Sequence, residues 1–550
     1  MSFRDTKAGI AGAAGMVVAL GVTELVHGLY GLVPSVLVSV AQGVVEYTPG
    51  EIVTAGIELL GSADIPILIS GTIVLTLLFA ALLGTLAVRH PSLALFGTVI
   101  LGVIALAACF AGPSVSPIPT IATIVGALIL GAGVSEALLR FAGLREAAGE
   151  PAPDGPEAPR SPVVRSRGAH SGSGISVNRS GFIAVSGAAA IAGLAAAGVG
   201  RLLAGGSSGA VSAPKPLRLP AEPKRSGREG VEKAPRHKVL SPPPKDASLD
   251  IPGMPALITP AEDFYLIDTA LSSPRIDASE WRLSVKGAVA NPIEVSYRDL
   301  LSMPTREADI TLACVSNEVG GDLVSNGRWT GVLLSDVLAE AGVSRGSIPR
   351  GGGQLVGRSM DGWTSGFKTE LALDGREALL AFGLNGSELP LKHGYPVRLV
   401  VPGLYGYVSA TKWLAELELK GWDFDAYWIQ RSWSKRGPIK TQSRIDTISD
   451  GQILPAGKVP IGGVAWAPHR GISGVEVSTD GGESWNPARL ARQLDVDTWR
   501  QYVYDWNATP GEYTLKVRAT DGEGNTQTAD ESPPHPSGAT GYHTVSVRVS

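Results

Sequence analysis

Residues 309–321 read DITLACVSNEVGG. The run ITLAC is typical of a buried β-strand, and it places Cys314 where that strand gives way to a polar loop that contains glycine. A thiolate is a soft metal ligand and a strong nucleophile. Taken alone, a single cysteine is more often an inert buried residue. A nucleophile needs a histidine partner, which no spacing singles out, and no zinc-type Cys/His spacing occurs.

A second run, LKHGYPVRLVVPGLYGYVSATKW, gathers groups that suit an anion. His393 precedes a glycine turn, Arg398 lies within a predicted strand, and Lys412 comes near the end of the run. Gly403 and Gly406 leave a loop that can approach a ligand closely. Cationic side chains and free backbone N–H groups together predict a site for phosphate or another anion. Arg398 and Lys412 taken alone are equally consistent with surface charges.

Short apolar runs surround these two motifs. WRLSVKG, IEVSY and PVRLVVPG predict strands, while LLSDVLAEAG and REALLAFG are typical of helices. We therefore expect an α+β domain over residues 251–435. Beyond about residue 450 the helical patterns stop, and alternating runs such as GVEVSTDGGESW and TWRQYVYDW are broken by Asp-Gly and Gly-Gly turns. These runs predict an immunoglobulin-like β-sandwich over 436–550, for which dimerisation is the expected role.

Taken in order, several pieces of the chain resemble the sulfite oxidase family of molybdenum enzymes. They are DFYLIDTALSSPRID, WRLSVKGAVANP, TLACVSN, WTGVLLSDVL, LLAFGLNGSELPLKHGYPVRLVVPG and TKWL. GVAWAPHRGISGVEVSTDGGESW and the GATGYH ending resemble the family's C-terminal dimerisation domain. The likeness covers about residues 255–550. Residues 1–250 lie outside it, although membrane-anchored actinobacterial members are similar in layout.

The resemblance implies one molybdopterin on molybdenum, held without an iron–sulfur cluster. It also implies that Cys314 is the protein ligand to the metal and the catalytic cysteine. Further residues match the family's contacts to the pterin and to its phosphate, the last three within the loop that wraps the phosphate. They are Phe264, Tyr265, Leu266, Ile267, Asp268, Ser359, His393, Arg398, Ala410, Thr411 and Lys412.

Two positions depart from the family pattern. Sulfite oxidases place arginines around the substrate oxyanion, and the corresponding residues here are Ile267 and Val319. Losing two charge-assisted hydrogen bonds of roughly 1.5–3 kcal/mol each predicts a substrate other than sulfite. No haem-binding cytochrome domain is evident, so an external electron partner is expected.

The first part of the chain has a different composition. Residues 1–145 are rich in Ala, Val, Leu, Ile and Gly with few charges. Five runs are apolar over the roughly 20 residues that a membrane span needs. They predict a four-helix transmembrane region over 1–145 and a fifth helix at 181–204, with a cleaved signal peptide as a minor alternative for the first run. The five runs are 8–28, 64–88, 92–112, 116–139 and 181–204.

Lysine and arginine mark cytoplasmic loops. Basic residues precede the first run, follow the second and fill 146–180, whereas the loop 29–63 has neither Lys nor Arg. This pattern predicts a multi-pass protein of the cell membrane with an internal N-terminus and an extracytoplasmic catalytic domain. The stretches 146–180 and 205–250, rich in Pro, Gly and Ser, are expected to be a cytoplasmic linker and a Pro-rich tether.

Other functions find less support. The net charge of −4 does not favour a nucleic-acid partner. The cysteines Cys109 and Cys314 lie in different parts of the chain, so no disulfide framework is expected. Haem ligation by His27 and His90 is disfavoured, because His27 is predicted near the outer end of the first helix and His90 near the inner end of the second, and bis-histidine ligation needs both at one depth.

The leading hypothesis is therefore a membrane-anchored molybdopterin-dependent oxidoreductase. It would transfer an oxygen atom to or from a small molecule and pass electrons to a cytochrome or a quinone-linked carrier. A reductase of methionine or other sulfoxides is an alternative of the same class. An inactive anchored binding scaffold is an alternative of another class, although Cys314, Arg398 and Lys412 are all present.

Overall fold

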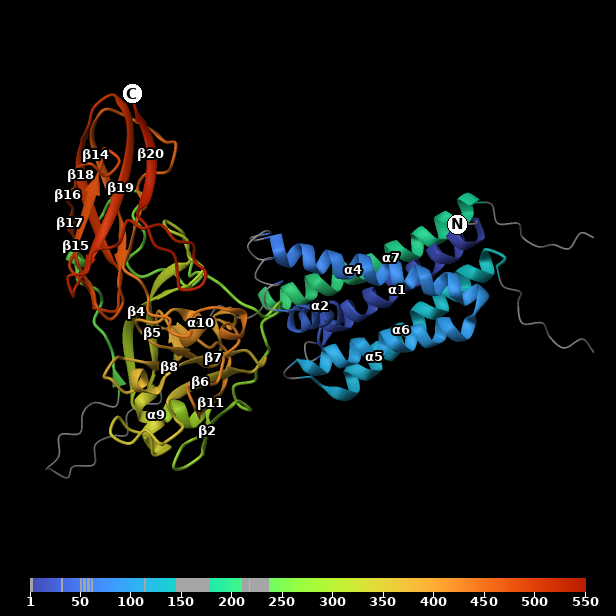
Figure 1. Ribbon diagram of the computed structural model, residues 1–550. Coiled ribbons are helices and arrows are strands. Elements are labelled where there is room, and N and C mark those ends of the chain that lie inside the picture. The colour runs from blue at the N-terminus through green and yellow to red at the C-terminus, as the bar shows by residue number, and fades with distance from the viewer. Residues whose placement is uncertain are drawn as a thin grey trace, which may run out of the picture. The chain divides into compact units, whose positions relative to one another are not determined.

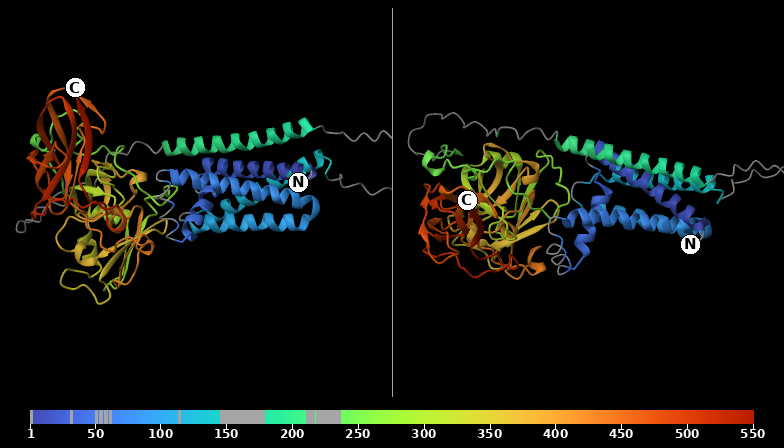
Figure 2. Two further views of the ribbon diagram at one scale, coloured as in Figure 1. Left: turned by 45° about the horizontal axis from the view of Figure 1, so that its top comes forward. Right: turned by 90° about the horizontal axis from the view of Figure 1, so that it is seen from above.

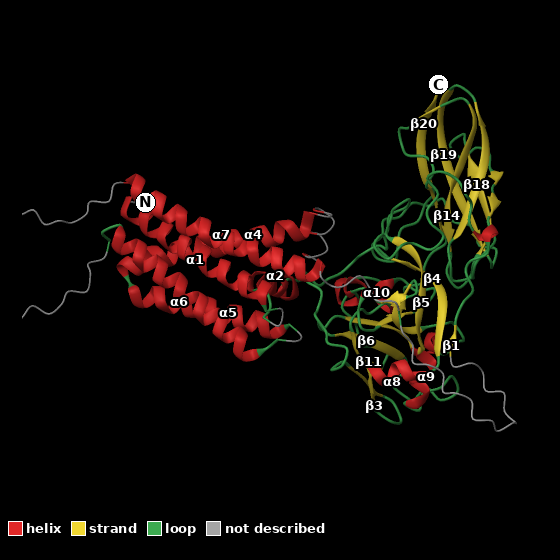
Figure 3. Cartoon of the chain, turned by 180° about the vertical axis from the view of Figure 1, so that it is seen from behind, coloured by secondary structure: helices red, strands yellow, loops and turns green. Residues whose placement is uncertain are grey.

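The computed structural model describes most of the chain, which divides into two compact units, Met1–Ala210 and Val211–Ser550. Figure 3 shows that the first unit is helical and that the second is built mainly of strands. The predicted linker 146–180 lies outside the described residues apart from its last two positions. The described residues are 3–30, 33–49, 52, 56, 60, 63–112, 115–144, 179–209, 217 and 237–550.

Five helices of the first unit are long and apolar enough to cross a membrane, by length and composition (Figure 1). Each predicted run falls on one of them. A sixth, shorter helix, α2 (Val36–Tyr47), lies in the stretch expected to be a loop, and its Ser35 cap accepts from the N–H of Val38. The five long helices are α1 (Phe3–Leu29), α4 (Asp64–Arg89), α5 (Pro91–Ala111), α6 (Pro117–Phe141) and α7 (Arg179–Gly209).

Glycines let α1 pack closely against its neighbours. Gly12 of α1 meets Gly84 of α4, and Gly21 of α1 meets Gly193 of α7, so that a Cβ on any of them would run into the other helix's backbone. Helix α7 accordingly runs beside α1 (Figure 2). In a lipid bilayer there is no hydrophobic driving force between helices, so their association depends on close van der Waals packing. Small residues at the contacts allow that packing.

His27 and His90, the two residues considered as haem ligands, lie near opposite ends of α1. His27 is in the last turn of α1, and its Nδ1 lies 2.7 Å from the carbonyl oxygen of Val33. His90 follows Arg89, whose Nη2 donates to Asp5 Oδ1 at 2.6 Å near the start of α1. Their separation along α1 agrees with the sequence argument against a shared haem.

The second unit begins with two mixed sheets that share one apolar core. The first sheet contains β1 (His237–Lys238), β4 (Thr305–Ala313), β5 (Val324–Leu333), β8 (Leu379–Leu384) and β10 (Arg398–Val400), with β9 (Ser387–Glu388) paired to β8. The second contains β3 (Ile293–Ser296), β2 (Arg282–Gly287), β11 (Leu414–Lys420), β6 (Gln354–Ser359) and β7 (Thr364–Lys368). Short helices link them: η2 (Lys245–Ala247), α8 (Tyr297–Ser302), α9 (Leu334–Glu340), η3 (Thr369–Ala372), η4 (Leu391–His393), α10 (Gly406–Ser409) and η5 (Ile429–Arg431).

One helix prediction in this region is wrong. The run LLSDVLAEAG does contain α9, but REALLAFG ends in strand β8, whose every residue is buried. A strand between two others, covered on both faces, is a continuous apolar run, and its alternation is lost. Its Leu and Ala content then imitates a helix. With helices this short, the α+β domain is better described as β-rich.

Two further sheets form the C-terminal part of the second unit around a separate apolar core. The alternating runs predicted as strands fall on β14, β15, β18 and β19. Val464, Trp466 and Trp499 belong instead to the core of the preceding sheets. The sheets are β12 (Gln442–Ile445), β14 (Gly457–Trp466), β18 (Arg500–Ala508) and β17 (Arg489–Leu490), and β13 (Ile453–Leu454), β20 (His543–Val549), β19 (Gly511–Asp521), β15 (Ile472–Ser478) and β16 (Asn486–Pro487).

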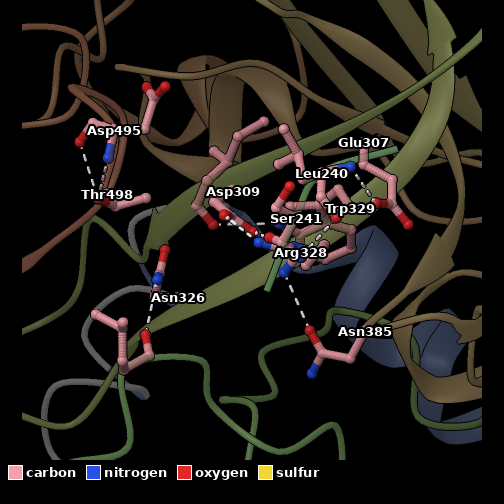
Figure 4. Close-up of polar contacts among 12 residues, drawn as sticks. Leu240, Ser241, Glu307, Asp309, Asn326, Arg328, Trp329, Asn385, Asp495 and Thr498 are labelled. Carbon is pink, nitrogen blue, oxygen red and sulfur yellow. Dashed lines mark hydrogen bonds and ion pairs between the residues drawn. The ribbon is translucent and has the colours of Figure 1, made fainter. Parts of the chain in front are cut away.

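The segment after β1, here called the strap, is residues 239–241, and hydrogen bonds between its backbone and the side chains of Arg328 and Glu307 hold it against the first sheet (Figure 4). Asp309 of β4 accepts two hydrogen bonds from Arg328 of β5, both of 2.8 Å. Arg328 Nη1 also donates to the carbonyls of Leu240 and Ser241, at 3.4 and 3.0 Å. Glu307 accepts from the N–H of Leu240 at 2.8 Å. Asp309 and Glu307 lie on the strand that leads to Cys314.

Candidate active site

Cys314 follows β4 directly and opens a short turn. Its N–H donates to Leu323 O at 2.9 Å, and Asn317 closes the turn by accepting from the N–H of Leu323 at 2.8 Å. The sulfur lies 2.9 Å from the hydroxyl oxygen of Ser316. Burial raises the pKa of the Cys314 thiol, so the free side chain stays protonated at neutral pH. Metal coordination removes that proton.

The negative charge of a Cys314 thiolate raises the pKa of two tyrosines, Tyr265 and Tyr405. Burial raises the pKa of Tyr265, and the thiolate form of Cys314 raises it further. Burial also raises the pKa of Tyr405 to about 12, with Cys314 acting in the same direction. Both phenols therefore keep their protons at neutral pH. They are available as hydrogen-bond donors near the sulfur.

Arg398 is a buried cation beside a neutral histidine. Its side chain donates to the carbonyls of His393 and Ala410, at 3.1 and 3.3 Å, and its Nε has no partner among the described residues. Burial lowers the pKa of Arg398 to about 10, so the guanidinium stays charged. The guanidinium carbon Cζ of Arg398 lies 5.1 Å from the ring centroid of Trp329. This is a cation–π contact.

His393 presents an unpaired ring nitrogen next to Arg398. Its Nε2 lies 3.1 Å from the carbonyl of Ala261, which can only accept, so Nε2 carries the proton. Nδ1 then offers a lone pair, and it has no partner among the residues that the structure describes. Burial, together with the charges of Arg398 and Lys412, lowers the pKa of His393 to about 4.

Lys412 is a second cation of this group. Its ammonium donates to Asp268 Oδ2 at 2.9 Å and to the carbonyl of Ile267 at 3.1 Å. Burial lowers the pKa of Lys412 to about 8, and Arg398 pushes in the same direction while Asp268 opposes it. Burial raises the pKa of Asp268, against the pull of Lys412.

Gly394 allows Arg398 and Lys412 to come this close. Its φ is +109°, and a Cβ at this position would lie 3.0 Å from both Arg398 Cβ and Lys412 Cα. A side chain there would push the two cations apart. The HGYP turn therefore unites the strand that carries Arg398 with the loop that carries Lys412, as the anion-binding interpretation requires.

Of the other residues predicted to contact the cofactor, Phe264 and Ala410 contact His393 or Arg398, whereas Thr411 contacts Ser365. Phe264 is buried, with its ring centroid 5.6 Å from that of His393. The carbonyl of Ala410 accepts from Arg398. The hydroxyl of Thr411 is 2.7 Å from that of Ser365, the carbonyl of Thr411 accepts from the N–H of Leu399 at 2.8 Å, and the residue is fully buried.

Ser359 lies at the end of β6, and its hydroxyl hydrogen-bonds with the backbone of the next turn. Its hydroxyl accepts from the N–H of Asp361 at 3.4 Å. The carboxylate of Asp361 acts electrostatically on Lys412, so this turn borders the cationic group.

Ile267 and Val319, which stand where sulfite oxidases have arginines, are both at least partly exposed to solvent, as is the neighbouring Leu266. Leu266 is 44% exposed and Ile267 is 46% exposed. Val319 is half-buried and packs near Gly541 of the C-terminal part.

Only one of the two glycines expected to approach a ligand borders the site. A Cβ on Gly406 would lie 3.7 Å from the hydroxyl of Tyr265, in ordinary contact. Gly403 faces away from it, because a Cβ there would lie 3.0 Å from His469 Cβ. The expectation for Gly403 is therefore wrong: its positive φ serves packing between loops.

Sequence reasoning missed Trp329 and Tyr405. Trp329 is completely buried beneath Arg398 and Phe264. Tyr405 lies in the GLYGY loop, and its proximity to Cys314 depends on a strand more than 80 residues earlier in the chain. No spacing rule joins these residues. Aromatic residues beside the two motifs were the only available signal.

These residues fit a molybdopterin phosphate and its metal. Arg398 Nε is a buried donor and His393 Nδ1 a buried acceptor, neither with a partner among the described residues, and the nearby Lys412 is paired with Asp268. Within the described residues, no three of His, Cys, Asp and Glu gather to hold a metal ion. Cys314 would thus be the protein's single ligand there, and the pterin would supply the remaining soft donors.

The comparison with known proteins agrees with this chemistry. Residues 270–428 match the oxidoreductase molybdopterin binding domain. Mitochondrial sulfite oxidase of Mus musculus is 31% identical over 291 residues, which cover 46% of this chain and 53% of the mouse protein. Sulfite oxidase of Arabidopsis thaliana is 26% identical over 361 residues, which cover 55% of this chain and 91% of the plant protein.

A solved structure, the sulfane dehydrogenase SoxCD from Paracoccus pantotrophus, aligns with 26% identity and a TM-score of 0.45, over 53% of this chain and 82% of that one. The chain spans about half the length of the mammalian relatives that it matches. The resemblance and the molybdenum–molybdopterin cofactor are both confirmed by these matches. The matched residues 270–428 are therefore a molybdopterin-binding oxidoreductase domain, and the chain is similar to sulfite oxidases over about half of its length.

Proposed function

We propose that the protein is a membrane-anchored oxidoreductase that transfers an oxygen atom at a molybdenum ligated by Cys314. The observation that carries this proposal is one partly accessible cysteine in the same domain as two buried cations, of which Arg398 leaves its Nε without a partner among the described residues. Such cations cost free energy unless an anion joins them. A pterin phosphate beside a metal-bound sulfur supplies that anion.

The chain's own residues would bind and orient the group. Arg398 and Lys412 would hold the phosphate, while neutral His393 would accept a hydrogen bond at Nδ1. Tyr265 and Tyr405 would donate protons in hydrogen bonds near the sulfur. When bound, the molybdenum supplies two-electron oxygen-atom transfer, which no protein side chain provides.

The substrate differs from sulfite in this proposal. Ile267 and Val319 bring no cation to the positions where sulfite oxidases place arginine. Ile267 instead presents an apolar side chain to solvent. An apolar or neutral reacting group suits this surface better than a compact dianion, which favours sulfoxides and related compounds.

The five helices that are long and apolar enough to cross a membrane support membrane anchoring. We place the N-terminus inside and residues 205–550 outside, with 251–435 as the cofactor domain and 436–550 as an immunoglobulin-like dimerisation domain. This layout is that of membrane-anchored actinobacterial members. A cytochrome or quinone-linked carrier would take up or deliver the electrons.

Metal analysis of the full chain purified in detergent tests the proposal. Wild-type protein should contain stoichiometric molybdenum and should turn over a sulfoxide with a reduced viologen dye, or a reduced sulfur compound with an oxidising dye. Cys314→Ser should abolish turnover while thermal unfolding stays near that of the wild type. Arg398→Ala should lower molybdenum content at least tenfold, since a charge-assisted hydrogen bond is worth roughly 1.5–3 kcal/mol.

The control is Arg436→Ala, which removes an exposed arginine. Protein without molybdenum, with no turnover of either substrate class, would establish the inactive scaffold instead. Full turnover of Cys314→Ser would refute the assigned ligand. Faster turnover of sulfite than of any sulfoxide would refute the substrate assignment alone.

A further inference from the structure

The Cys314 turn, residues 314–321, consists of two successive reverse turns that follow β4. The N–H of Asn317 donates to Cys314 O at 3.2 Å, and the N–H of Gly321 donates to Glu318 O at 3.0 Å. A loop with few hydrogen bonds of its own opens more readily than a strand does. A residue that ligates a metal needs its direction fixed by the groups behind it. The contacts that hold this turn from outside therefore bear on the chemistry at Cys314.

Arg444, on β12 of the C-terminal part, binds the end of the Cys314 turn. Its Nη1 donates to Gly321 O at 2.6 Å. Its Nε donates to Asp446 Oδ1 at 2.6 Å, and these two side chains are only 12% and 11% exposed. Asp446 is fixed in its turn, because its Oδ2 accepts from the N–H of Val464 at 3.1 Å. Arg444 therefore bridges an immobilised carboxylate and the turn that carries the cysteine.

The neighbouring strands fix the backbone of Arg444 as well. A Cβ on Gly463 of β14 would run into Arg444 O and would lie 2.7 Å from Asp446 Oδ2. The hydroxyl of Tyr502 on β18, a residue that is completely buried, donates to Arg444 O at 2.8 Å. The glycine permits the close approach and the tyrosine secures it, so the guanidinium is held in one place before it reaches the turn.

His543, the first residue of β20, supports the same turn at Gly320. The φ of Gly320 is +80°, and a Cβ at this position would run into the imidazole ring of His543. Nδ1 of His543 accepts from the N–H of Ile445 at 3.0 Å, which fixes the ring. Burial and the charge of Arg444 lower the pKa of His543, so the ring is neutral and its proton is on Nε2.

Three consecutive residues of the turn thus meet the C-terminal part. Val319, which precedes the two glycines, lies beside Gly541, where a Cβ would be 3.7 Å from Val319 Cγ2. All of these contacts are made within one chain. They need no second copy of the protein, and a part that served dimerisation alone would not require them.

We infer that Arg444 and His543 are positioning residues for Cys314, and that they fix the direction in which its sulfur meets the molybdenum. Both act through the turn rather than on the metal itself. This inference rests on the proposed function and deepens it, because it makes the C-terminal part a component of the catalytic unit in addition to its expected role in dimerisation.

The mobility of the turn can be measured without turnover. In full-length protein prepared free of molybdenum, iodoacetamide alkylates Cys314 at a rate that peptide mass spectrometry reports, and Cys109, which is 1% exposed, serves as the internal reference. Arg444→Ala should raise this rate about 10–100-fold, because the turn loses a hydrogen bond from a charged donor. Arg444→Lys should retain part of the protection, since an ammonium can still donate to Gly321 O.

The direction of the sulfur is measured in the molybdenum-loaded protein. Electron paramagnetic resonance of Mo(V) is sensitive to the orientation of a thiolate ligand, and the wild type should give a single signal. Arg444→Ala and His543→Gln should each broaden or split that signal, and should lower kcat while KM stays unchanged. His543→Gln keeps an acceptor for the N–H of Ile445 but removes the ring behind Gly320.

The matched control is Arg500→Ala. Arg500 is a half-buried arginine of β18 whose Nε and Nη1 donate to the carbonyls of Ala491 and Ile472, at 2.6 and 2.8 Å, both within the C-terminal part. This variant should melt at a lower temperature than the wild type, with the alkylation rate and the resonance signal unchanged. A purely structural role of Arg444 would give the same result for Arg444→Ala.

Wild-type alkylation rates and wild-type resonance signals in Arg444→Lys, Arg444→Ala and His543→Gln would overturn the inference, whatever happens to stability. If Arg444→Ala fails to fold, the two milder variants decide. Failure of the proposed function is distinguishable, because it means that molybdenum is absent or that Cys314→Ser remains active. The positioning role alone fails when loaded, active protein shows no difference between these variants and the wild type.

Discussion

Lys412 combines a positive charge with burial, and its charge therefore depends on pH near neutrality. Burial lowers its pKa to about 8, which Asp268 counteracts only in part. The ammonium form predominates below pH 8 and is lost above it. Any anion that Lys412 helps to hold is therefore bound best below pH 8.

We predict that the affinity of cofactor-free protein for inorganic phosphate falls as the pH rises through 8, by up to about tenfold per pH unit. Phosphate is almost entirely a dianion from pH 8 upward, so the loss of affinity above pH 8 reports on the protein. Calorimetric titration from pH 7 to pH 10 measures it. Lys412→Gln should bind phosphate weakly at all these pH values, and a wild-type profile in that variant would contradict the assignment.

Residues next to a recognisable motif were predictable, and residues brought in by the fold were not. Cys314, Arg398 and Lys412 stand in runs whose chemistry can be interpreted locally. Arg431 stands in a run of mixed aromatic and charged residues, which the sequence presents as ordinary surface. Its burial depends on which elements cover it, and only packing decides that.

At the scale of elements, the strap after β1 depends on Asp309 and Arg328. Their side chains are 3% and 15% exposed. Asp309→Ala would leave a largely buried guanidinium without its carboxylate, which should destabilise the second unit by about 3–5 kcal/mol. Chemical denaturation measures the loss, and limited proteolysis near residue 240 reports release of the strap.

The matched control for the strap is Lys238→Ala. Its ammonium pairs with Glu377 at 3.0 Å, but both side chains are substantially exposed. Such a pair contributes about 0–1 kcal/mol. An equal effect of the two substitutions would show that the buried pair is no more important than the surface pair.

Helix α7 provides a second test at this scale. A Cβ on Gly200 would lie 2.7 Å from Leu25 Cα of α1, whereas a Cβ on Gly198 would meet nothing within 4 Å. Gly200→Ala should therefore force the helices apart at a cost of about 1–3 kcal/mol, and Gly198→Ala should not. Thermal unfolding in detergent compares them. Similar melting temperatures for both variants would contradict the close packing of α7 on α1.

At the scale of the whole molecule, the charge bias of the loops predicts orientation. Protease added outside intact cells should digest or release the unit Val211–Ser550, while an N-terminal tag stays protected. Release of that unit only after the membrane is permeabilised would reverse the predicted topology. Immunodetection of both ends in one experiment gives the result.

The sequence alone determined the division into an apolar helical part and a β-rich part, because composition and periodicity are local properties. It also identified Cys314 and the cationic run, since their residue types carry the chemistry. The tertiary structure decided that REALLAFG ends in a strand, that Gly403 serves packing, and that Arg431 is buried. Burial and pairing depend on partners distant in the chain, and no local pattern encodes them.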